Sequence, residues 1–167
     1  MKERIIFEQF EFARNLTLLV AKETTEENAD VIFKGFPNSL RWQFGHIFTS
    51  VEEIVFKSSN ETINSPEKYG ELFNQGTRPS EWKTNPPAIE EIVRLLSEQL
   101  KRVKETFYGR LDEKLTEPLI AGPLTLETIG DLLSFAAFHE SEHIGVIKSL
   151  LNALKGETQE PLMPKSK

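Results

Sequence analysis

The chain has 167 residues, and its 20 Lys and Arg residues against 26 Asp and Glu residues leave a formal net charge of −6. That balance excludes nucleic acid and an anionic membrane surface as main partners, because both require clustered positive charge. Cysteine is absent, so disulfides, thiolate nucleophiles and Cys-ligated metals are excluded. The sequence shows no signal-peptide or membrane-span pattern, which predicts a cytoplasmic protein.

Helical periodicity in four segments predicts an all-α fold, a four-helix bundle with long connections. The first helix is expected over about 2–22. The second is expected over about 39–58, with Asn38 or Ser39 as its N-cap.

The third helix is predicted to open at 85–87, because the first turn of a helix tolerates proline, and its apolar stripe continues to Phe107. The fourth is expected from about Thr125 to Lys155, with Gly156 ending it. The only strand-like stretch, 118–123, is short and bounded by prolines, so no strand is predicted.

Three long connections, which permit crossovers between the helices, are expected at about 23–38, 59–85 and 113–125. The middle one is predicted to contain a short helix over 66–73, capped by Ser65. We expect a single domain over 1–156, followed by a flexible tail over 157–167.

His139 and His143 stand four residues apart in the fourth helix and therefore share one face. The helical wheel places that face on the apolar ladder, so both imidazoles are predicted at core positions. A buried imidazole needs partners for both nitrogens, and a divalent cation accepts a lone pair from each of two such rings. The pair is therefore interpreted as metal ligands. The alternative is two core histidines bonded to water or to neighbouring helices.

His46 lies in the second helix, on the edge of its apolar face. A residue between core and water suits a ligand at the mouth of a cleft, and it equally suits an ordinary surface histidine. The metal hypothesis depends on all three histidines converging.

The string from His139 to His143, His-Glu-Ser-Glu-His, fits two zinc-protease patterns, H-E-x-x-H and H-x-x-E-H. Neither is favoured, because the 24 residues after His143 offer no further helix to carry a third ligand. Glu140 and Glu142 flank the histidine pair on the wheel. They either orient the ligating rings or lie in solvent. The second Glu-x-x-His motif that a di-iron bundle requires is missing.

The segment 38–46, Asn-Ser-Leu-Arg-Trp-Gln-Phe-Gly-His, and the segment His139-x3-His143-x-Gly145-x-Ile147 together resemble the DinB-like (YfiT-like) superfamily. The resemblance implies a four-helix bundle, commonly a homodimer, with one divalent metal held by three histidines on two helices. Residue by residue, His46, His139 and His143 match those ligands. Val146 departs from the Gln that many members carry after the glycine.

Members of the superfamily include bacillithiol S-transferases, a mycothiol-dependent isomerase and metal-dependent hydrolases. The resemblance therefore implies a small-molecule substrate, a low-molecular-weight thiol among the candidates. It also implies a zinc or nickel ion, with manganese or iron compatible with imidazole donors. Glu140, Glu142 or Glu53 is the expected proton carrier. The alternatives are a non-enzymatic dimer in which the metal joins two helices, and a helical interaction module without metal.

The connection from Tyr69 to Trp82 is rich in aromatic residues. It either covers the open face of the site, with Arg78 supplying a positive charge, or uses its aromatic side chains to anchor a long loop.

Overall fold

A computed structural model describes residues 3–156 of the chain, and it is mostly helical, as the periodicity predicts. Residue 2 and the tail expected at 157–167 lie outside the described residues. Within them, no helix combines the length and the apolar character that crossing a membrane requires. The long helices are α1 (Glu3–Ala21), α2 (Leu40–Val51), α4 (Ile89–Phe107) and α5 (Ile129–Gly156). A π-helical turn, η1 (Glu52–Lys57), continues α2 to nearly the end expected for it.

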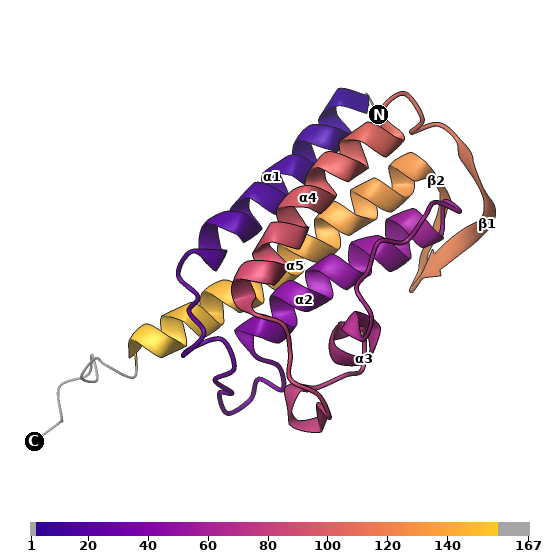
Figure 1. Cartoon of the computed structure of the whole chain (residues 1–167). Coiled ribbons are helices and arrows are strands. Elements are labelled where there is room, and N and C mark those ends of the chain that lie inside the picture. The colour runs from indigo at the N-terminus through magenta and orange to yellow at the C-terminus, as the bar shows by residue number, and fades with distance from the viewer. Residues whose placement is uncertain (1–2, 157–167) are drawn as a thin grey trace, which may run out of the picture.

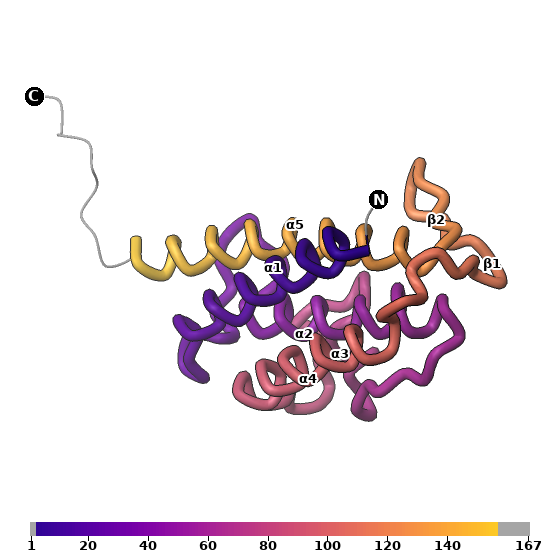
Figure 2. Tube along the Cα trace, turned by 90° about the horizontal axis from the view of Figure 1, so that it is seen from above, coloured from indigo at the N-terminus to yellow at the C-terminus, as the bar shows by residue number. Residues whose placement is uncertain are grey.

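The four long helices pack side by side (Figure 1), with α1 against α4 and α5, and α2 against the same two helices. In the view of Figure 2, α1 and α5 form one layer and α2 and α4 form the other. The strands lie at one end of the helices. The core consists of two apolar clusters, one containing Phe44, Leu96 and Leu150 and the other Phe10, Val55 and Leu132.

Three of the long helices, and the turn that follows α2, each place a buried polar residue near the boundary of the two clusters. Arg14 on α1, Gln99 on α4 and Glu140 on α5 are all at most 2% exposed, and Glu52 follows directly after α2 at 1%. A polar layer therefore crosses the middle of the core.

The prediction that the connection at 113–125 contains no strand is wrong. The chain there forms an antiparallel hairpin of β1 (Lys114–Ala121) and β2 (Leu124–Thr128), in which Leu119 pairs with Leu126. The register is irregular between Lys114 and Leu119, and Pro118, which lacks an amide hydrogen, lies in that stretch. The apolar signal is weak because Leu126 is the only residue of the two strands that is fully buried.

The hairpin also corrects the start of the fourth helix, which is Ile129 and not Thr125. A reciprocal pair of hydrogen bonds begins α5: the Asp131 amide donates to Thr128 Oγ1, and the Thr128 amide donates to Asp131 Oδ2. This capping box satisfies amide groups that the first turn leaves without partners.

Ser39 caps α2 as predicted, because its side chain accepts a hydrogen bond from the Trp42 amide. The cap predicted at Ser65 is wrong: the short helix α3 (Tyr69–Phe73) follows Lys68, whose φ of 73° lies in the left-handed region. Prolines 86 and 87 precede α4 and are not in its first turn, because Ala88 is extended. Glu26 Oε1 accepts a hydrogen bond from the first amide of α4, that of Ile89, at 2.6 Å.

Gly45 allows α3 to pack directly against α2. A Cβ atom at this position would lie 2.4 Å from carbon atoms of the Phe73 ring, closer than carbon atoms that are not bonded to each other approach. The only side chain that fits between the Phe73 ring and α2 is therefore a hydrogen atom.

Replacing Gly45 with Ala is expected to lower the free energy of unfolding by about 1–3 kcal/mol, the cost of forcing an added methyl group into a packed core. Gly145→Ala is the matched control, because a Cβ there meets nothing within 4 Å. It should stabilise α5 by up to about 1 kcal/mol, the difference between the two residues in a helix. Urea denaturation measures both; equal effects would show that the Phe73 ring moves aside freely.

Candidate metal centre

The structure brings the three histidines together, one from α2 and two from α5. One ring nitrogen from each of His46, His139 and His143 lies within 4.8 Å of the other two. The Nε2 atoms of His139 and His143 are 3.2 Å apart. Nitrogen ligands about 2.0–2.1 Å from one tetrahedral ion are separated by about 3.3 Å. The three-histidine group could therefore hold a metal ion, with the α5 pair already at the spacing of two ligands.

Two of the rings are held by hydrogen bonds that determine which nitrogen is free. His46 Nδ1 is 2.7 Å from the carbonyl oxygen of Phe73, and His143 Nδ1 is 2.6 Å from Gln43 Oε1. Both oxygens only accept, so each Nδ1 donates and carries the proton. Each Nε2 then keeps its lone pair and is free to bind a cation.

The indole of Trp42 holds the His46 ring from one side. The two rings stack with their centroids 4.5 Å apart and their planes 14° from parallel. The indole is itself fixed, because Trp42 Nε1 donates to Thr77 Oγ1 at 2.8 Å. The Trp-x-x-Gly-His segment therefore has a structural explanation: Trp42 stacks on His46, and Gly45 admits the ring of Phe73, whose carbonyl binds His46.

The burial of the histidines is the reverse of the prediction. His46, predicted at the edge of its helix, is only 7% exposed. His139 and His143, predicted at core positions, are half-buried. Every residue of α2 is buried, because α3 and its connections also cover the side of the helix that carries His46. On α5, Glu140 is among the most deeply buried residues, so the face of the helix that points to the core centre is the one that carries Glu140. The histidine pair therefore faces away from the core centre.

All three rings are held neutral. Burial lowers the pKa of His46 to about 4, although the hydrogen bond to Phe73 opposes this shift. Burial and the nearby rings of His139 and His46 lower the pKa of His143 to about 3. Burial also lowers the pKa of His139, while the charges of Glu142 and Glu140 act in the opposite direction. Neutral imidazoles are the form that binds metals.

The histidines open onto a cavity of about 870 Å³. Its walls come from α2 and η1, from α5, from the hairpin over Leu119–Gly122, and from Asn74 and Gln75 after α3. A volume of this size suits a small-molecule site.

Two of the three predicted proton carriers, Glu53 and Glu142, line the cavity with the histidines. Glu53 is paired with Lys57, one turn further along. Glu142 is exposed and forms no ion pair within residues 3–156. Of the two, only Glu142 has no ion pair with the residues that the structure describes.

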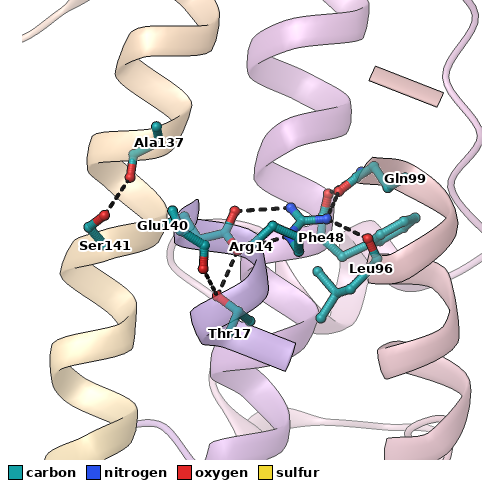
Figure 3. Close-up of polar contacts among 9 residues, drawn as sticks. Arg14, Thr17, Phe48, Leu96, Gln99, Ala137, Glu140 and Ser141 are labelled. Atoms are coloured by element: carbon teal, nitrogen blue, oxygen red, sulfur yellow. Dashed lines mark hydrogen bonds and ion pairs between the residues drawn. The ribbon is translucent and has the colours of Figure 1, made fainter. Parts of the chain in front are cut away.

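Glu140, the third predicted proton carrier and the position of the general base in an H-E-x-x-H motif, does not line this cavity. It points from α5 toward α1 (Figure 3), where Arg14 Nε donates to Oε1 at 2.8 Å and a second guanidinium nitrogen donates to Oε2 at 3.1 Å. Thr17 Oγ1 donates to Oε1 at 2.6 Å. Arg14 also donates to the Leu96 carbonyl and to Gln99 Oε1 on α4. Both charged side chains are completely buried.

The aromatic residues of the connection from Tyr69 to Trp82 anchor it to the core. Tyr69 and Phe73 are buried in the first apolar cluster, and Trp82 packs against it. This is the second of the two alternatives for the connection. Arg78 is not part of the cavity lining, so the positive charge of the first alternative is not found there.

The residues that orient the histidines were not identified from the sequence. Gln43 is three residues before His46 on α2, and nothing in its spacing indicates that it reaches α5. The contact at Phe73 uses a backbone carbonyl, for which a sequence contains no signal. Ser50 Oγ, 3.4 Å from His46 Nε2, was also missed.

The family model of the DinB superfamily matches residues 9–147, a range that contains all three histidines. No curated protein matches the chain.

Replacing Glu140 with Gln tests its assignment to the core. The variant removes the charge that compensates Arg14, so the free energy of unfolding should fall by about 3–5 kcal/mol, as when one partner of a buried pair is lost. Ser141→Ala is the control, because that hydroxyl donates only to the Ala137 carbonyl of its own helix, and its effect should stay within about 0.5 kcal/mol. A Glu140→Gln variant of unchanged stability in guanidinium denaturation would contradict the assignment.

The metal-free protein should lose stability as the pH falls below about 6.5. Unfolded histidines bind protons near that pH, whereas the folded rings of His46 and His143 resist protonation down to about 4 and 3. Each such ring lowers the free energy of unfolding by up to about 1.4 kcal/mol per pH unit in that range. Urea denaturation between pH 7 and pH 5 in the presence of a chelator measures the slope. His46→Gln should reduce it, and a flat profile would contradict neutral rings.

Proposed function

The chain belongs to the DinB superfamily, and on that premise we propose that it is a metal-dependent enzyme of small-molecule chemistry that activates a low-molecular-weight thiol for S-transfer. The observation that carries the proposal is the three-histidine cluster that opens onto the large cavity. We further propose that the four long helices form a four-helix bundle and that the protein acts as a homodimer in the cytoplasm.

The residues present fit a divalent ion. His46, His139 and His143 would hold it through neutral imidazole nitrogens, two of them aimed by hydrogen bonds on the opposite ring atom. Such an ion keeps its full 2+ charge, so it supplies the Lewis acidity that favours ionisation of a coordinated thiol or water. Zinc and nickel are the preferred candidates among the metals that accept imidazole donors.

A metal site that is open toward the cavity favours an enzyme over a protein in which the metal only joins two helices. Among residues 3–156, the cluster contains the three histidines and no fourth His, Asp or Glu. The side facing the cavity is lined by residues from four separate segments, which leaves room for a small molecule beside the histidines. A purely structural site is normally closed by a fourth protein ligand.

The carboxylates favour a thiol over water as the activated group. Glu140, the base that an H-E-x-x-H hydrolase uses, is occupied by Arg14, and Glu53 is paired with Lys57. Only the exposed Glu142 remains without an ion pair in the described cavity lining. A free thiol ionises near pH 8.5 and free water near pH 15.7, so a thiol bound to the metal loses its proton with less help from a base. A site with one free carboxylate therefore suits the thiol better. Hydrolysis is the second candidate, with Glu142 as its base.

Elemental analysis of the purified protein tests the metal site. We expect about one divalent ion per chain, and almost none in His139→Ala, because two imidazoles bind far more weakly than three. Gln75→Ala, which changes the same cavity without removing an imidazole, is the control and should bind normally. Circular dichroism verifies that each variant is folded. Undiminished metal uptake by His139→Ala would refute the ligand assignment.

The same proteins test S-transfer. The metal-loaded protein should accelerate the reaction of 2-mercaptoethanol with a neutral alkylating reagent at pH 7, and the chelator-treated protein and His139→Ala should not. Metal uptake without any acceleration would leave the site standing and reject the thiol proposal in favour of hydrolysis.

A further inference from the structure

The charged residues of the cavity are of one sign. Glu53 and Glu142 line it, and no Lys or Arg of residues 3–156 does so. The charge of Glu53 is offset by Lys57, whereas that of Glu142 is not offset by an ion pair. The fixed charge that a bound molecule meets away from the histidines is therefore negative and comes mainly from Glu142.

Glu142 lies beside the histidines, because it precedes His143 and is one helical turn after His139. It is exposed and lines the cavity, so its carboxylate lies on the open side of the site and not in the core. A molecule that places one atom at the histidine cluster and extends outward therefore passes this carboxylate.

The remaining wall is largely apolar. Its apolar part includes Ile54, Phe135 and the hairpin residues Leu119 to Ala121, of which Ile120 is 66% exposed, and its polar part, Ser50, Asn74 and Gln75, carries no charge. An apolar wall beside a single carboxylate suits an organic cation, whose alkyl groups lose little on leaving water. An anionic group would face both the apolar surface and a like charge.

We infer that the molecule bound at this site carries a positive charge on the part that extends outward past Glu142, and that Glu142 selects it against anionic thiols. This inference rests on the proposed function, because it assumes that the sulfur atom is directed to the metal. Two unit charges about 6 Å apart in water change an affinity about threefold. Removing the charge of Glu142 should therefore weaken the binding of a cationic thiol about threefold and strengthen that of an anionic thiol by the same factor.

The test uses the cobalt(II)-loaded full-length protein, because a thiolate bound to cobalt gives a charge-transfer absorption that reports binding directly. Thiocholine is the cationic probe, 2-mercaptoethanesulfonate the anionic probe and 2-mercaptoethanol the neutral reference. Each is titrated into the wild type, Glu142→Gln and Glu90→Gln. Glu90 is an exposed residue of α4, which contributes nothing to the cavity, so its variant makes the same change in net charge elsewhere.

The ratio of thiocholine affinity to sulfonate affinity should fall about tenfold in Glu142→Gln and stay at the wild-type value in Glu90→Gln. Comparing each thiol with itself across the variants removes differences in thiol acidity. An unchanged ratio in Glu142→Gln, or no binding of thiocholine to a protein that has taken up cobalt, would overturn the inference and leave the metal site intact. A protein that takes up no cobalt would overturn the proposed function as well.

Discussion

The buried ion pair between Arg14 and Glu140 is the interaction on which the orientation of α5 depends. Two completely buried charges are stable only with each other and with further hydrogen bonds, which Thr17, Gln99 and the Leu96 carbonyl supply. Satisfying Glu140 in this way sets the rotation of α5 about its axis. His139 and His143, on either side of Glu140 along the helix, then face α2 and the cavity and not the centre of the core.

The polar layer has a second consequence for the site. Gln99 continues it to the Phe48 carbonyl and to Glu52 at the start of the π-helical turn, so α2 is held by the same group of residues that holds α5. The two helices that carry the histidines are therefore linked by hydrogen bonds through α1 and α4. A core built only of apolar contacts would tolerate small rotations of each helix, whereas directional hydrogen bonds do not. This is how the fold keeps ligands from distant parts of the chain within bonding range of one point.

The other face of the site depends on how closely α3 approaches α2. Because Gly45 has no side chain, the Phe73 ring packs directly on the helix and brings its carbonyl to His46. The same packing buries α2 on all sides, and burial keeps the rings neutral. A contact that stabilises the core thus also prepares the nitrogens for a cation. Asn74 and Gln75, directly after α3, then form part of the cavity wall.

The sequence by itself determined the mostly helical fold and a cap at Asn38 or Ser39, because these follow from local periodicity and side-chain chemistry. It paired His139 with His143 by their spacing, whereas His46 joined them only through the resemblance to the DinB-like superfamily. It did not determine which histidines are buried. Glu140 looks like a border residue on a wheel, and only Arg14, 126 positions away, makes its burial possible. The hairpin, the orienting roles of Gln43 and the Phe73 carbonyl, and the single sign of charge in the cavity were likewise decided by tertiary structure. Each of them depends on groups far apart in the chain, whose pairing no local pattern records.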